Sequence, residues 1–147
     1  MNKLTAQERA ERSANAMWEN DAASKELGIV LEGVGPGWAE ASLYVATKHL
    51  NGHNICHGGF IFTLADTAFA FACNSYNRCA VAQHNSITFI QPGRPGSALH
   101  AKAVEVSCEG RSGIYDVTVT DDAGERIALF RGHSRTIKGT LFNEDND

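Results

Sequence analysis

One stretch of the sequence, residues 51–74, constrains the fold more than any other. It begins as a polar loop that ends in His-Gly-Gly at 57–59, and it continues as roughly 16 residues that are apolar on almost every side. A helix that is hydrophobic all round belongs inside a protein rather than on its surface. We therefore expect this segment, which opens at Gly58 and Gly59, to form a central helix around which the rest of the chain packs.

The predicted helix carries one acidic residue, Asp66, two turns inside an otherwise apolar segment. An isolated carboxylate in such surroundings costs several kcal/mol unless it has partners or a task. Burial would raise its pKa, which suits a general base or a nucleophile near neutral pH. The alternative is an aspartate that only hydrogen-bonds a neighbouring element. Because local capping is unavailable that far inside a helix, we favour the functional interpretation.

Gly58 and Gly59 open the predicted helix. Backbone N–H groups at a helix N-terminus lack partners within the helix and favour a developing negative charge, so these glycines could form an oxyanion site. The alternative is a tight turn in which glycine is merely convenient. The loop before them adds the polar side chains of Asn51, His53 and His57. Together with Asp66, this combination indicates an active site.

The spacing of these residues matches a known family. The pattern Asn51-x5-His57-Gly-Gly, followed by Thr-Leu-Ala-Asp at 63–66, resembles the hot-dog-fold acyl-CoA thioesterases and is most similar to the phenylacetic acid degradation thioesterases. Ile-Gln-Pro-Gly at 90–93 and Gly-His-Ser-Arg at 132–135 fit the same resemblance, which covers roughly residues 25–138.

The resemblance implies hydrolysis of an aryl-acyl-CoA thioester, such as phenylacetyl-CoA or its ring-hydroxylated form, to the free acid and coenzyme A. The catalytic set would be Asp66, Gly58, Asn51 and His57. Asp66 would either activate water or attack the thioester and form a mixed anhydride. No cofactor is expected, because coenzyme A is part of the substrate. The alternatives are a hot-dog acyl-CoA hydratase or dehydratase and a non-catalytic acyl-CoA-binding protein.

Substrate contacts are expected from the second glycine, from the strand after the helix and from basic side chains. Related thioesterases often have a hydroxyl residue early in that strand, whereas this chain has none before Ser86, so Gln83 would replace it. Arg131, His133 and Arg135 share one face of the last strand, and arginine suits the phosphates of coenzyme A. The alternative is a solvated basic face. The predicted substrate-binding residues are Gly59, Gln83, Arg94, Arg111, Arg131 and Arg135, with Arg94 and Arg111 in nearby turns.

His49, His53, Cys56 and His57 raise the alternative of a zinc site, since these residue types bind zinc and a catalytic zinc would activate water. Ligands so close together on one loop rarely converge without a second cluster, and the later histidines are isolated. We therefore expect no metal.

The remaining elements indicate an α+β domain. Thr5 and Glu8 match a capping box at the start of a surface helix over 5–20, and a short turn follows between Asp21 and Gly28. Ala39, Ala41, Leu43 and Val45 alternate with polar residues, the pattern of a half-buried strand. We expect a sheet of five to six antiparallel strands from these segments: 29–34, 38–45, 79–90, 99–106, 114–120 and 126–137. The predicted parts are an N-terminal helical segment, 1–24, a hot-dog domain, 25–138, and a disordered polar tail, 139–147.

A single sheet cannot fully enclose an apolar helix, so a partner subunit is expected to cover the remainder. The resemblance likewise implies a dimer, and a dimer of dimers beyond it. Eight residues separate Gly58 from Asp66, which is about 12 Å along a helix. We therefore predict a site shared between subunits, with Asn51, His57 and Gly58 from one chain and Asp66 from the other.

Bulk properties narrow the setting. A net charge of −4 over 147 residues argues against nucleic acid as a partner. The N-terminus shows no apolar signal-peptide core, and no run reaches the ~18 apolar residues of a membrane span. The four cysteines are too few and too scattered for a disulfide framework. We expect a cytoplasmic protein.

Overall fold

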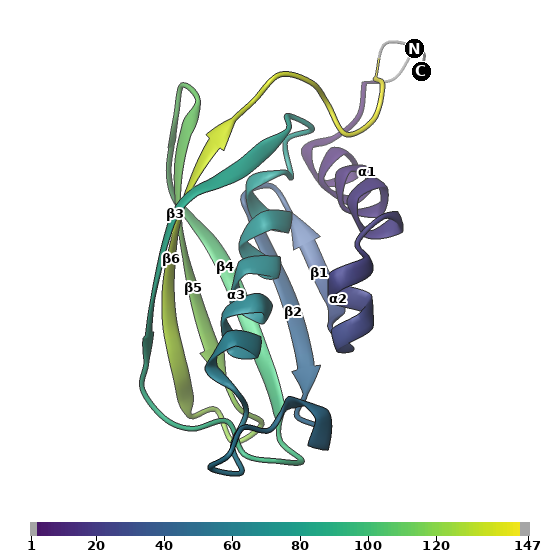
Figure 1. Ribbon diagram of the computed structural model, residues 1–147. Coiled ribbons are helices and arrows are strands. Elements are labelled where there is room, and N and C mark those ends of the chain that lie inside the picture. The colour runs from purple at the N-terminus through teal and green to yellow at the C-terminus, as the bar shows by residue number, and fades with distance from the viewer. Residues whose placement is uncertain (1–2, 145–147) are drawn as a thin grey trace.

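Six strands form one antiparallel sheet that curves around a single long helix, α3 (Figure 1). The structure is a computed structural model that describes residues 3–144. The strands lie in the order β1-β2-β4-β5-β6-β3, which confirms the expected α+β hot-dog class with six strands. The elements are α1 (Ala6–Glu19), α2 (Ala22–Leu27), β1 (Val30–Gly35), β2 (Trp38–Tyr44), the 3-10 turn η1 (Thr47–His49), α3 (Gly58–Cys73), β3 (Ala80–Phe89), β4 (Ala98–Glu109), β5 (Ser112–Thr120) and β6 (Arg126–Thr136).

The core lies between α3 and the concave face of the sheet, where α3 packs mainly against β2, β4 and β5. The alternation predicted for β2 is confirmed, because Ala39, Ala41 and Leu43 are all buried beneath the helix. Two alanines of the neighbouring strand, Ala101 and Ala103, pair with the alanines of β2. These small side chains leave room for α3 to lie close to the sheet.

The bulkiest part of the core is built where β6 lacks a side chain. A Cβ at Gly132 would lie 2.7 Å from the ring of Phe69, so only glycine lets the ring pack against this strand. Phe69 also contacts the rings of Tyr115 and Phe130, with ring centres 5.7 and 5.9 Å away.

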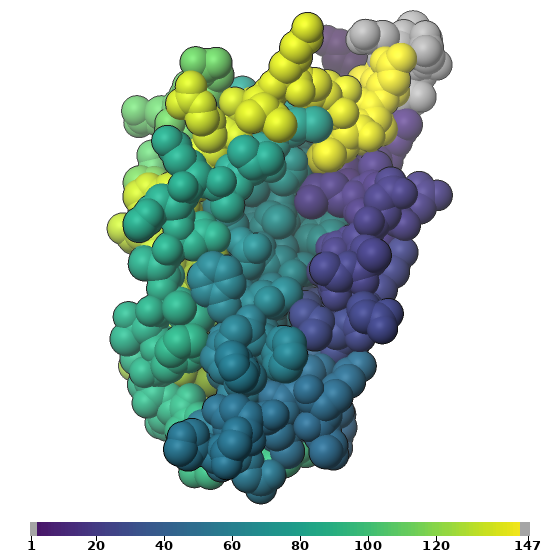
Figure 2. All heavy atoms as spheres, viewed as in Figure 1, coloured from purple at the N-terminus to yellow at the C-terminus, as the bar shows by residue number. Residues whose placement is uncertain are grey.

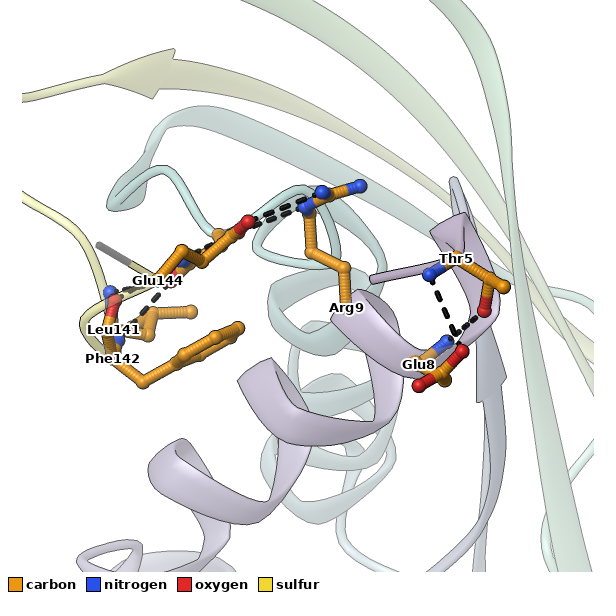
Figure 3. A network of polar contacts seen from close by, with 7 residues as sticks. Thr5, Glu8, Arg9, Leu141, Phe142 and Glu144 are labelled. Carbon is orange, nitrogen blue, oxygen red and sulfur yellow. Dashed lines mark hydrogen bonds and ion pairs between the residues drawn. The ribbon is translucent and has the colours of Figure 1, made fainter. Parts of the chain in front are cut away.

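The N-terminal helices lie beside the β1 edge of the sheet, opposite the β3 edge (Figure 1). Their predicted ends are confirmed. Thr5 and Glu8 form a reciprocal capping box at α1 (Figure 3). Asp21 caps α2, which ends at Gly28 in the left-handed conformation. The face of α1 toward the core carries Ala10 and Ala14, both buried.

The C-terminal tail departs from the prediction of disorder. Residues 139–144 pack on the body of the protein, whereas 145–147 lie outside the described residues. The amide of Asn77, 4% exposed, makes four hydrogen bonds to the tail. Its oxygen accepts the N–H groups of Leu141 and Phe142, and its nitrogen donates to the Phe142 carbonyl and to Glu144. The composition of the tail could not predict this contact, because the contact depends on a side chain 64 residues upstream.

The same tail reaches α1. Glu144 receives two hydrogen bonds from Arg9, of 2.8 and 3.1 Å (Figure 3). Arg12 lies over the ring of Phe142, 4.4 Å from its centre. The tail thus connects the end of the sheet to the N-terminal helix. The predicted part boundaries at 24/25 and 138/139 stay predictions.

Among residues 3–144, none of the helices combines the length and the apolar run needed to span a membrane.

Candidate active site

The N-terminus of α3 is arranged by His57. Its carbonyl accepts the Phe60 N–H, and its Nδ1 accepts the Gly59 N–H at 2.9 Å. Two glycines were predicted to be oxyanion donors, and the N–H of one of them, Gly59, is therefore already hydrogen-bonded. Within residues 3–144 no acceptor hydrogen-bonds the Gly58 N–H. Gly58 is the donor left available at the positive end of the helix.

Asn51 shapes the loop that precedes the helix. Its side-chain oxygen accepts the N–H groups of His53 at 2.9 Å and Ile55 at 3.4 Å. The loop also contains Asn54 with φ of 61°, a left-handed conformation that asparagine tolerates. The Asn51 amide nitrogen makes no hydrogen bond to the described part of the chain, so it can donate to a ligand.

A pocket of about 440 Å³ adjoins this N-terminus. Phe89 forms part of its wall, and a Cβ at Gly58 would lie 3.0 Å from the end of the Phe89 ring. The lining is mostly apolar and brings together two predicted catalytic residues with several side chains that sequence reasoning missed. The lining residues are Asn51, Ile55, Cys56, Gly58, Ile61, Phe89, Ile90, Gln91 and Pro92. The Ile-Gln-Pro-Gly motif at 90–93 was the signal that pointed to part of this wall.

Asp66 lies outside this pocket, on a stripe of α3 that the rest of the described chain leaves only partly covered. The stripe consists of Gly59, Phe62, Thr63, Asp66 and Ala70. In the space-filling view the surface over α3 is recessed between β3 and the N-terminal helices (Figure 2). Burial raises the pKa of the Asp66 carboxyl above its ordinary value, and a hydrogen bond from Asn85 opposes that rise. The direction matches the expectation from the sequence.

Asn85, on β3, is a site residue that sequence reasoning missed. Its amide nitrogen donates to Asp66 Oδ1 at 3.0 Å. The available signal was alternation, because Asn85 shares the inward face of β3 with Ile87 and Phe89, opposite the inward residues of β6. Gln83, which was predicted from this strand, is exposed at a β-bulge between Ala82 and His84. Its role in substrate binding stays a prediction.

The predicted basic residues do not all converge within one chain. Arg131 forms a two-pronged ion pair with Asp116, at 2.6 and 2.8 Å, on the sheet face opposite α3. Arg94 precedes β4 and Arg111 follows it, so the length of that strand, roughly 35 Å, separates them. Arg111 lies beside the end of the last strand, since its carbonyl accepts the Thr136 N–H. The turn that holds Arg94 follows Gln91, whose N–H donates to the Ile127 carbonyl at the start of the same strand.

Two of the four side chains considered as zinc ligands, His49 and Cys56, are poorly suited to that role. Both ring nitrogens of His49 are engaged by main-chain groups, those of Ala46 and Leu27. Burial raises the pKa of the Cys56 thiol to about 11, which disfavours the thiolate that zinc binds. Residues 3–144 contain no group of three or more histidine, cysteine or acidic side chains placed to hold a metal ion.

Known proteins share this architecture. The sequence model of the family described as the thioesterase superfamily matches residues 53–128 of this chain. The acyl-coenzyme A thioesterase PaaI of Escherichia coli (strain K12) is 44% identical over 137 residues, which cover 92% of this chain and 97% of that protein.

Solved structures give the same result. The E. coli PaaI protein from the phenylacetic acid degradation operon superposes with a TM-score of 0.91 at 43% identity, covering 92% of this chain and 99% of that one. A Streptococcus mutans protein bound to acetyl-CoA has a TM-score of 0.72 at 26% identity, with coverages of 76% and 90%. The chain described here belongs to the thioesterase superfamily.

Proposed function

We propose that this protein is an acyl-CoA thioesterase that hydrolyses aryl-acyl-CoA thioesters, phenylacetyl-CoA or its ring-hydroxylated form, to the free acid and coenzyme A. The observation that carries the proposal is Gly58, which lines an apolar pocket at the positive end of α3 and whose N–H has no acceptor within residues 3–144. Such a donor stabilises the charge that develops on a thioester oxygen, and the pocket suits an apolar acyl group. The identity of 44% to E. coli PaaI supports the same chemistry.

The residues suggest how the reaction runs. The thioester oxygen accepts the Gly58 N–H, while His57 keeps the neighbouring N–H occupied and Asn51 donates from the loop. Asp66, as a base, takes a proton from water as the hydroxide attacks the carbonyl carbon. As a nucleophile, it attacks that carbon itself, and water then hydrolyses the anhydride. In either route the C–S bond breaks and the coenzyme A thiolate leaves, taking up a proton.

The site is proposed to form between subunits. The partly covered stripe on α3 supports a homodimer in which two such helices pair in antiparallel fashion. This pairing would bring Asp66 of one chain to Gly58 of the other. A dimer of dimers and a cytoplasmic setting belong to the same proposal. No cofactor is required.

The seat of the coenzyme A phosphates is proposed to use a subset of the arginines. Arg94 lies at the same end of the sheet as the α3 N-terminus, since Gly93 accepts the Cys56 N–H. Arg111 and Arg135 lie at the other end, and Arg131 already has an acidic partner. We therefore expect each active site to use only the arginines that its two subunits place close to the bound coenzyme A.

Release of free thiol from a panel of acyl-CoA thioesters, followed with a disulfide reagent, tests the proposal. Phenylacetyl-CoA and its hydroxylated form should be the best substrates. Asp66→Asn should lower kcat by ~10²–10⁴ with KM little changed. Asp122→Asn, the same chemical change in an exposed turn, is the matched control and should retain activity.

Three results would count against these assignments. No thiol release from any thioester would refute the enzyme and leave an acyl-CoA-binding protein. Consumption of an enoyl-CoA without thiol release would indicate the hydratase. An active Asp66→Asn variant would remove Asp66 from the mechanism.

A further inference from the structure

The Asp66 carboxylate has one hydrogen-bonding partner within residues 3–144, the side chain of Asn85. The amide nitrogen lies 3.0 Å from Asp66 Oδ1. The second carboxylate oxygen, Oδ2, accepts no hydrogen bond from the described chain. The amide thus holds one oxygen and leaves the other for a reactant.

The carbonyl oxygen of the same amide carries an energetic penalty in the folded protein. Asn85 Oδ1 is buried and has no hydrogen-bond partner among the described residues. A buried acceptor left without a donor loses the hydration that it has in the unfolded chain, and most such groups in folded proteins are satisfied. An apolar side chain of the same shape would avoid that loss. Folding alone therefore does not explain an asparagine at this position.

The surroundings of Asp66 otherwise favour its protonated form. The helix α3 is apolar around it, and no lysine, arginine or histidine of residues 3–144 forms an ion pair with it. His49 and His57 contact α3 at its first turn, through the ring of Phe60 and, for His57, the Gly59 N–H. Tyr115 and Glu105 face α3 from the sheet, Cys73 follows on α3 itself, and Asp21 reaches Thr67 through Ser24. The Asn85 N–H is the group that favours the carboxylate over the acid.

We infer that Asn85 is a positioning residue for the thioesterase reaction, which holds the Asp66 carboxylate ionised and directs its free oxygen toward the substrate. The inference rests on the proposed function and deepens it. Asn85 acts through Asp66 and need not touch the substrate.

Asn85→Leu tests this, because leucine has a similar volume and no donor. At pH values on the acidic limb of the kcat profile, where Asp66 is only partly ionised, the variant should lose about ten-fold relative to wild type. That is the factor expected from one hydrogen bond to a charged group. On the alkaline plateau kcat should stay within about three-fold. At acidic pH, where Asp66 is protonated in both proteins, the melting temperature should be unchanged or higher, because the unsatisfied oxygen has gone.

Two further variants separate the amide from its position. Asn85→Asp keeps the shape but replaces the donor with a second acid, so the acidic limb should move in the same direction and further. Ser86→Ala, on the opposite face of β3, is the matched control and should leave the profile unchanged. A wild-type profile in Asn85→Leu or Asn85→Asp would overturn the inference.

A measurement without turnover separates this inference from the proposed function. If wild type releases no thiol, the thioesterase proposal fails, and melting temperature against pH still tests Asn85. A raised Asp66 pKa makes stability fall as pH rises toward that pKa. In Asn85→Leu that fall should extend to higher pH than in wild type. Curves that differ only by a constant offset would overturn the inference.

Discussion

The sharpest consequence of the site geometry is that two half-sites should complement each other. Eight residues of α3 separate Gly58 from Asp66, so about 12 Å lies between the oxyanion donor and the carboxylate of one chain. An attacking group has to come within ~3–3.5 Å of the thioester carbon. The pocket at Gly58 accordingly includes no atom of Asp66. A partner helix that runs antiparallel would close the distance.

The test combines two variants, each of which carries one substitution in a different part of the shared site. An Asn51→Ala chain and an Asp66→Asn chain should each be nearly inactive alone. Unfolded together and refolded in equal amounts, about half of the dimers should contain one chain of each kind. Each mixed dimer has one site with both lesions and one with neither. Activity should therefore recover to roughly a quarter of the wild-type value.

The assay is thiol release per protomer, with native mass spectrometry to count mixed dimers. Each variant refolded with itself gives the background, and refolded wild type gives the upper limit. The two single variants are measured first, because the test needs both to be inactive. If mixed dimers are present and activity stays at background, both parts of the site belong to one chain, and the distance argument fails.

Two further predictions concern stability. Burial raises the pKa of Asp66, so the folded protein keeps the carboxyl proton to higher pH than the unfolded chain does. The stability of the wild-type protein should therefore decline as the pH rises above about 4, the ordinary pKa of an aspartate, and level off above the folded-state pKa. Asp66→Asn lacks this decline, so its melting temperature should exceed that of wild type at neutral pH and match it below about pH 4. A difference in melting temperature that stays constant with pH would contradict this. Asn77→Gly should lower the free energy of unfolding by roughly 2–4 kcal/mol through four lost hydrogen bonds to the tail, measured in urea at one protein concentration. Asn77→Ala should lose about 1 kcal/mol more, because φ at this position is 58°; equal stability of Asn77→Gly and wild type would show that the tail contributes nothing.

The parts of the fold that were predicted correctly depend on short-range patterns. The apolar run predicted α3, the Thr5–Glu8 pair predicted the start of α1, and the alternation in β2 predicted which side faces the core. Each of these signals lies within one or two turns, or within one strand, so a single sequence contains it in full. The hot-dog class followed from these elements together with the family resemblance.

The sequence by itself determined the central helix, its single carboxylate and the polar loop at its start, because these are adjacent in the chain. Only the tertiary structure decided which groups meet them. Asn85 reaches Asp66 through sheet register, His57 removes the Gly59 N–H from the candidate donors, and Asn77 captures the tail. Such contacts depend on strand pairing, bulges and side-chain orientation, and no local period of the sequence records them.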